Sequence, residues 1–149
     1  MSYISNPYYG PYVIKTILNN WTALAGYPTP LPTILTPDQA IAGRIPDDQN
    51  NLFFCYQKGP TKSSSFAVLT NATYNAIYTV KVEIRAYTRG LLISYFEHFK
   101  KLLDYYRWNP STKHLIIQKE SREDKSQASS HQFKFIFTLS LLSPGETLS

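Results

Sequence analysis

The chain has 149 residues, 43% of them hydrophobic, and a single cysteine, so one folded domain over residues 1–149 is expected and an internal disulfide or a multi-cysteine zinc site is excluded. No apolar run approaches the roughly 18 residues of a membrane span, and the first residues lack the pattern of a signal peptide, so we expect synthesis in a cytoplasm and no membrane partner. Charged residues make up only 17% of the chain at a net charge of +5, whereas 12 Tyr, 8 Phe and 2 Trp are present, a composition typical of large protein interfaces.

The N-terminal part is predicted to form a helix of about four turns. Pro11 is expected at the first helical position after Gly10, and Gly26 stands where a left-handed cap would end the helix. Residues 1–10 are expected to be flexible up to this helix, as chain termini usually are. The apolar face recurs at helical spacing and consists of Ile14, Ile17, Leu18, Trp21 and Leu24.

A rigid connector is predicted next, at residues 27–32, because its prolines fix φ and remove amide donors. Residues 36–39 have the pattern of a capping box and predict a short helix that ends at Gly43. These patterns leave the topology of residues 27–51 open.

The clearest predicted strand covers residues 79–88, where apolar and polar side chains alternate, so that one face is buried and the other faces water or a partner. Its apolar side is formed by Val80, Val82, Ile84 and Ala86. Further strands are expected at residues 52–56, 66–69, 114–119 and 132–142.

A second, longer helix is predicted at residues 91–107, where apolar residues recur on one face. Residues 120–130 are polar and mixed in charge, so we expect a mobile loop there, and residues 144–149 are expected to be flexible. The predicted fold class is α+β: an antiparallel sheet of about four to five strands, with the long amphipathic helix packed on one face and an N-terminal helix.

Reactive side chains are few and poorly grouped. Cys55 lies in an apolar strand with no neighbouring basic group to activate its thiol, so we interpret it as a core residue. His98 lies on the polar face of the second helix and is expected to be solvated, whereas His114 and His131 approach each other only if their strands pair. Neither has an Asp, Glu or Cys at ligand spacing, so no metal site is predicted.

The acidic residues do not indicate an enzyme. Asp47 and Asp48 lie in a predicted loop, and Glu97 and Asp104 share a helix with lysines one turn away, which is typical of surface ion pairs. The glycines form no phosphate-binding loop, so no cofactor is predicted. The alternating Phe residues of the last strand are spaced like a base-stacking platform, but core packing against the helix is the preferred interpretation.

Residues 78–90 (YTVKVEIRAYTRG) form an alternating strand that meets the helix ending near Tyr106 through a very short turn. In this unit, and in its order of elements over residues 11–142, the chain resembles the tail terminator (tail-completion) proteins of long-tailed phages and related archaeal viruses. It departs from them in the proline-rich connector and short helix at residues 28–43, which are together longer than the family's usual link between the first helix and the first strand. The resemblance implies a non-enzymatic virion protein of the tail or neck: a hexameric ring that caps the tail tube, docks the neck or connector proteins, and lets DNA pass non-specifically through its lumen.

One candidate contact site lies on the water-facing side of the central predicted strand. It consists of Lys81, Glu83, Arg85 and Tyr87, which we predict to form a subunit interface, so that Arg85→Glu is expected to weaken ring formation.

A second candidate site lies in the predicted loop, where Lys119, Arg122 and Lys125 are expected to face the lumen or a partner. The alternative from another class is a sheet-based nucleic-acid or regulatory binding module, whose nucleic-acid complexes would depend steeply on salt.

Overall fold

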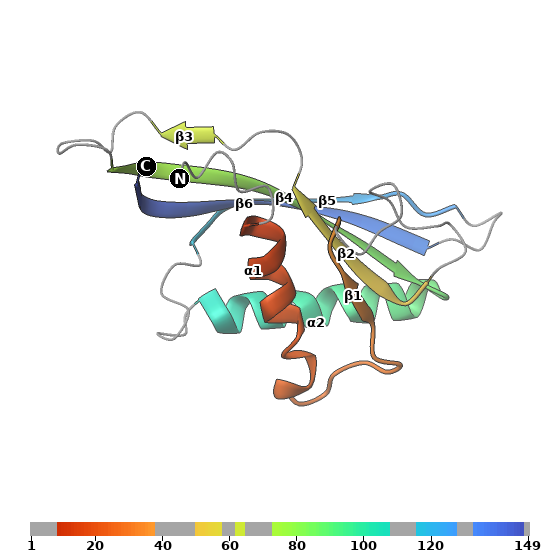
Figure 1. The fold of residues 1–149 in the computed structure, drawn as a ribbon. Helices are drawn as coiled ribbons and strands as arrows, with labels where there is room; N and C mark the ends of the chain where they lie inside the picture. Colours follow the sequence, from red (N-terminus) through yellow and green to blue (C-terminus); the bar gives the residue numbers. More distant parts are fainter. Residues whose placement is uncertain are drawn as a thin grey trace.

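The computed structural model describes residues 9–37, 50–57, 62–64, 73–107, 116–127 and 133–147, in which two helices lie on one side of a sheet (Figure 1). In chain order the elements are α1 (Tyr9–Leu18), the 3-10 turn η2 (Trp21–Ala23), β1 (Thr33–Leu35), β2 (Leu52–Gln57), β3 (Lys62–Ser64), β4 (Thr73–Ala86), α2 (Arg89–Arg107), β5 (Ile116–Asp124) and β6 (Phe133–Thr147).

The sheet has the strand order β1-β2-β4-β6-β5, with the short β3 paired to the beginning of β4. The pairs around β4, β6 and β5 are antiparallel, but β1 runs parallel to β2. The sheet is therefore mixed, and the expectation of a purely antiparallel sheet is wrong at this one pair. The segment between β1 and β2 is long enough for a parallel return, whereas β1 itself is only three residues long between Pro32 and Pro37 and carries no periodic signal.

The core lies between the sheet and the two helices, which cover the same face (Figure 1). At its centre the Trp21 ring meets Phe53 at 5.3 Å and Tyr95 at 5.6 Å between centroids, edge to face. This arrangement confirms the α+β class and assigns the Phe residues of β6 that face the helices to the core. The inward rows are 0–3% exposed and comprise Val80, Val82, Ile84 and Ala86 of β4 and Phe135, Phe137, Leu139 and Leu141 of β6.

The N-terminal helix is shorter than predicted, because α1 ends at Leu18. Asn20 accounts for the break: its side chain donates to Thr16 O at 2.9 Å, and its backbone N–H bonds to a carbonyl only three residues back, which tightens the chain. The chain continues into η2, which buries Trp21. Gly26 has the expected left-handed conformation, with φ of +80°, but it follows η2 rather than α1.

The segment after η2 lies against α2 and is held there by hydrogen bonds. Trp21 Nε1 donates to Pro28 O at 3.2 Å, and the Tyr95 hydroxyl donates to Pro30 O at 2.5 Å. His98 Nε2 donates to Trp21 O at 2.8 Å, and His98 is only 3% exposed. The prediction of a solvated His98 is therefore wrong, because Trp21 of η2 packs on α2 at that position, with its ring centroid 4.5 Å from that of His98.

Strands β5 and β6 extend further than the sequence predicts. Residues 120–124, expected in a mobile loop, belong to β5 and pair with β6. Residues 144–147, expected to be flexible, belong to β6, and Tyr9 and Gly10 belong to α1. The polar residues of β5 are typical of a loop, which is why the sequence predicts one. An edge strand such as β5, however, needs apolar side chains only on the face that it buries.

Several sequence predictions fall outside the described residues and stay predictions. These are most of the short helix that ends at Gly43, the strand at residues 66–69, the pair Asp47 and Asp48, and the two histidines His114 and His131.

Asn51 joins β1, β2 and β4 at one end of the sheet. Its backbone is left-handed, with φ of +58°, and its carbonyl oxygen accepts from Thr33 N–H at 2.9 Å. Its side-chain Oδ1 accepts from Tyr87 N–H at 3.2 Å, directly after β4. Asparagine tolerates this backbone conformation better than most residues, so one side chain fixes the start of β2 and the turn out of β4.

We expect Asn51→Ala to lower the free energy of unfolding by about 2–3 kcal/mol, because it combines a strained left-handed alanine with the loss of the bond to Tyr87. Asn51→Gly keeps the backbone conformation and loses only the bond, so it should cost about half as much. Urea denaturation of the three proteins measures both effects. An alanine variant as stable as the glycine variant would contradict this role.

Candidate functional site

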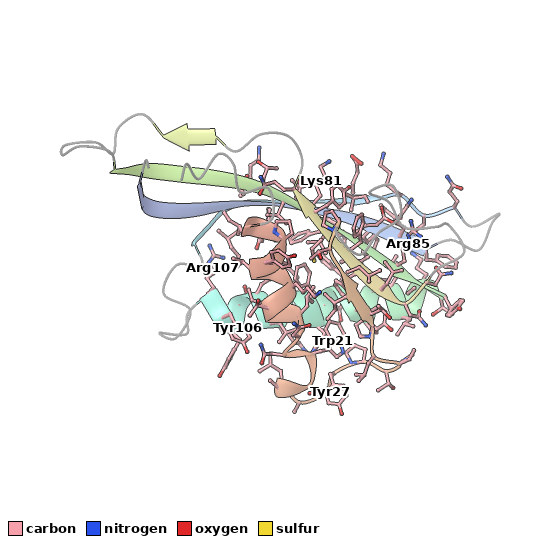
Figure 2. The ribbon with its side chains drawn as sticks, in the orientation of Figure 1. Trp21, Tyr27, Lys81, Arg85, Tyr106 and Arg107 are labelled. Carbon is pink, nitrogen blue, oxygen red and sulfur yellow. The ribbon has the colours of Figure 1, made fainter. Side chains whose placement is uncertain are left out.

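The candidate site is the face of the sheet that points away from α1 and α2, here called the outer face (Figure 2). Residues paired across neighbouring strands share a face, so the strand register defines it. One row across β2, β4, β6 and β5 consists of Tyr56, Lys81, Thr138 and Ser121. The next row, two residues along each strand, consists of Phe54, Glu83, Ile136 and Glu123. The remaining members are Leu52, Thr79, Arg85, Lys119, Lys134 and Ser140.

The β2 side of the outer face is apolar. Leu52 and Phe54 are 2% and 4% exposed, with Leu35 of β1 packed against them. The Phe54 and Tyr56 rings stack with centroids 5.1 Å apart. Burial and the neighbouring Glu83 carboxylate both raise the pKa of Tyr56, so its hydroxyl stays protonated at neutral pH.

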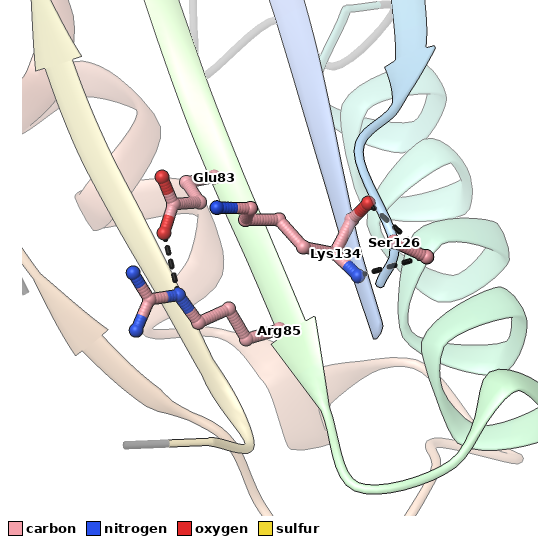
Figure 3. A network of polar contacts seen from close by, with 4 residues as sticks. All are labelled: Glu83, Arg85, Ser126 and Lys134. Atoms are coloured by element: carbon pink, nitrogen blue, oxygen red, sulfur yellow. Dashed lines mark hydrogen bonds and ion pairs between the residues drawn. The ribbon is translucent and has the colours of Figure 1, made fainter. Parts of the chain in front are cut away.

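The β4 stripe next to it carries a mostly buried ion pair. Arg85 Nε lies 2.5 Å from Glu83 Oε2, and the two side chains are only 4% and 13% exposed (Figure 3). Lys134 of β6 extends its ammonium group toward the same carboxylate (Figure 3). The register pairs Lys134 with Arg85, so two cations and one anion lie together here and this point of the outer face has a positive excess.

The four residues predicted as a subunit interface do not have equal access to a partner. Alternation places Lys81, Glu83 and Arg85 on the outer face as expected, but Arg85 is buried, so the prediction of a solvent-side contact is wrong for this residue. Lys81 is half-buried, and Tyr87, just beyond the end of β4, is 62% exposed. Of the four, Tyr87 is the most accessible.

The three cations predicted in a common loop are separated by the strand that they occupy. Lys119 is exposed on the outer face, opposite Ser140. Arg122 points to the helix side, where its guanidinium carbon lies 4.9 Å from the Phe96 ring centroid and 4.6 Å from that of Phe135. Lys125 pairs with Glu123 at 3.0 Å.

On the helix side, Lys100 and Glu120 form a half-buried ion pair at 2.5 Å. Beside α2 a shallow recess of about 200 Å³ is lined by Gly26, Pro28, Ser94, Glu97, His98 and Lys101. Because the His98 imidazole already donates to a backbone carbonyl, its observed role in this recess is structural.

The lone cysteine, Cys55, is buried in β2. Burial raises the pKa of the Cys55 thiol to about 12, so the thiolate is essentially unpopulated. No three His, Cys, Asp or Glu side chains gather into a metal-binding group within the described ranges. None of the helices in those ranges is long and apolar enough to cross a membrane.

Comparison of the sequence with protein-family models and with curated proteins gives no match. The interpretation of the outer face therefore rests on its geometry and chemistry. The alternation of apolar and polar residues in the sequence predicts this face on β4 and β6. It does not predict that the face continues onto β5, because the polar residues of β5 have the composition of a loop.

We expect Glu83→Gln and Arg85→Met each to lower the free energy of unfolding by about 3–5 kcal/mol, since each leaves a mostly buried charge without its partner. The double variant should cost less than the sum of the two single variants. Urea denaturation provides the values, with Lys81→Gln as the half-buried control, expected to stay within about 0.5 kcal/mol of the wild type. Additive losses would show that the two charges do not interact.

Arg85→Glu, which places two carboxylates side by side, is expected to unfold the subunit and so does not test assembly.

Asp124 gives a prediction for the dependence of stability on pH. Hydrogen bonds from Ser126, and then the Arg89 guanidinium at 2.8 Å, lower the pKa of this carboxyl to about 2 from 3.8. A carboxyl group whose pKa is lowered by folding stabilises the folded state at pH values above its unfolded-state pKa. This stabilisation is lost as the pH falls from about 4 toward 2. Because the side chain is 37% exposed, Asp124→Asn should cost less than about 1 kcal/mol at pH 7. The difference should disappear near pH 2, and a difference independent of pH in thermal denaturation would contradict this account.

Proposed function

We propose that the chain is a structural virion subunit: a tail terminator-like protein that forms a ring, caps the tail tube and contributes to the head–tail junction. The observation that carries the proposal is the number of large apolar side chains left in water. They are Tyr12, Tyr27, Leu31, Tyr87, Ile93 and Tyr105, which are 38–62% exposed.

The positions of these side chains along the chain suit a ring. A cyclic ring with head-to-tail contacts uses two different patches on each subunit, because the donor and acceptor surfaces are not the same. Leu31 and Tyr27 follow η2 and Ile93 lies in the N-terminal half of α2, whereas Tyr105 lies near the C-terminal end of α2 and Tyr12 on α1. Tyrosine dominates the set, and it supplies contact area at low entropic cost.

The architecture also supports the proposal. The resemblance depends on an alternating strand that runs through a very short turn into a long helix, followed by a closing strand pair. β4 leads into α2 across only Tyr87 and Thr88, and β5 and β6 form an antiparallel pair behind the helix. Likeness at this level supports a function less strongly than a matching site does, which is why the exposed side chains carry the argument.

In this proposal the partners are further copies of the chain in a hexameric ring, the tail tube protein below the ring, and the neck proteins above it. DNA passes through the lumen without sequence-specific contacts. The role is geometric, because a closed ring occupies the place of the next tube subunits and stops their addition. The protein would act in the virion, without a cofactor.

We expect light scattering over a range of protein concentrations to give a species of about six times the chain mass of 17.1 kDa, and negative-stain electron microscopy to show rings. The variants Leu31→Ser/Ile93→Ser and Tyr12→Ser/Tyr105→Ser should each reduce the mass to that of one chain, since each removes one of the two patches. Glu97→Gln, an exposed change on the same helix as Ile93, is the control and should leave the ring intact.

Rings that persist in both double variants would contradict the assignment of these patches. A mass of one or two chains at every concentration, combined with salt-sensitive binding of oligonucleotides, would instead favour the nucleic-acid or regulatory binding module.

A further inference from the structure

The outer face carries more positive charge than its own ion pairs neutralise. Arg85 pairs with Glu83, and Lys125, the residue after β5, pairs with Glu123. The other cations of this face are Lys81, Lys119 and Lys134, and within the described ranges none of the three has an ion-pair partner.

Among the described side chains, the acidic residues without an ion-pair partner lie elsewhere. Glu97 and Asp104 are both exposed on α2, and neither has an ion-pair partner among the described residues. Because α2 covers the opposite side of the sheet, these carboxylates cannot neutralise the outer-face lysines directly (Figure 1).

The three lysines are spaced along the strands with hydroxyl groups between them. Lys119 lies opposite Ser140, and Lys81 lies opposite Thr138, two residues further along β6. Lys134 itself is a further four residues along the same strand. At about 3.4 Å per residue, the three positions extend over roughly 20 Å.

This combination suits one class of ligand. Lysine ammonium groups and serine or threonine hydroxyls are among the side-chain groups that contact nucleic-acid phosphates and sugars. A repeating chain of phosphates can meet all three lysines, whereas a single small anion cannot span them. Next to Lys81, the half-buried Tyr56 ring is the aromatic group in this row, and a tyrosine beside a cation is able to stack an unpaired base.

We propose that the outer face of β4, β6 and β5 binds the phosphate backbone of nucleic acid without sequence preference, through Lys81, Lys119 and Lys134. The inference rests on the proposed function in one respect: if the chain forms the proposed ring, the outer face is the surface of each subunit that meets the DNA in the lumen. The binding itself is a property of the single chain and is measured independently of ring formation.

The test is fluorescence anisotropy of a labelled single-stranded oligonucleotide of mixed sequence, and of its duplex, titrated with the full chain between 50 and 200 mM salt. Contact with about three phosphates predicts a slope of log K against log salt of roughly −2 for the single strand and −3 for the duplex. Affinity should therefore fall about 20- to 40-fold over this range.

Lys119→Gln and Lys101→Gln form a matched pair, because both lysines are exposed and both variants lose one charge, on the outer face and on α2 respectively. Lys119→Gln should reduce the magnitude of the slope by about 1 and weaken binding at low salt, and Lys81→Gln should do the same. Lys101→Gln should leave the slope unchanged. Circular dichroism establishes that each variant is folded.

Equal weakening by Lys101→Gln would overturn the proposal, because binding would then depend on net charge alone. An absence of binding at 50 mM salt, or equal affinity for polyglutamate, would overturn it as well. Light scattering on the same samples separates the two hypotheses: rings without oligonucleotide binding contradict only the outer-face inference, and binding by single chains without rings contradicts only the ring.

Discussion

The packing of one face of β4 against α2 is the constraint on which the rest of the structure depends. The strand and the helix are joined by only two residues, and Thr88 caps the helix by accepting from Leu91 N–H at 3.1 Å. With so short a link, the helix must return immediately across the sheet, and it meets the inward row of β4, which is completely buried. The neighbouring strands β2 and β6 take their register from β4, so this one contact determines which side chains every central strand turns outward.

The buried ion pair on the other face of β4 reinforces this register. A mostly buried Glu83–Arg85 pair adds little net stability compared with apolar residues of the same size, because desolvation offsets most of the attraction. Its effect on specificity is larger. A shift of β4 by one residue would turn Arg85 and Glu83 into the apolar core, at a cost that no apolar pair would impose. The Glu83–Arg85 pair therefore disfavours a sheet in which β4 is shifted by one residue. The lysines around the pair take no part in this and are available for another role.

The sequence is sufficient to predict those parts of the fold in which the pattern is local. The alternation of residues 79–86, the helical repeat of α2 and the alternating Phe residues of β6 each lie within one element, and the structure contains each of these elements. The bounds differ, because β4 covers Thr73–Ala86 rather than residues 79–88. The errors arise where a residue's environment is set by a distant segment. His98 is covered by Trp21 of η2, and Arg85 lies in the row of Leu52, whose position depends on strand pairing. The three-residue β1 and the polar edge strand β5 have almost no periodic signal, so only their partners define them. For the candidate site, alternation found the correct face of β4 but not the extent of the face or the accessibility of its residues.

The position of Cys55 has a practical consequence. It is the only cysteine of the chain, it is 0% exposed on β2, and its inward side chain belongs to the main core. A thiol in this state reacts with an alkylating reagent only after β2 has separated from the helices, since neither the sulfur nor its thiolate is otherwise accessible. The natural protein thus contains a single built-in reporter of core opening. Its labelling rate gives the opening equilibrium without an engineered cysteine. Comparison between dilute and concentrated samples shows whether association with other copies makes this opening rarer.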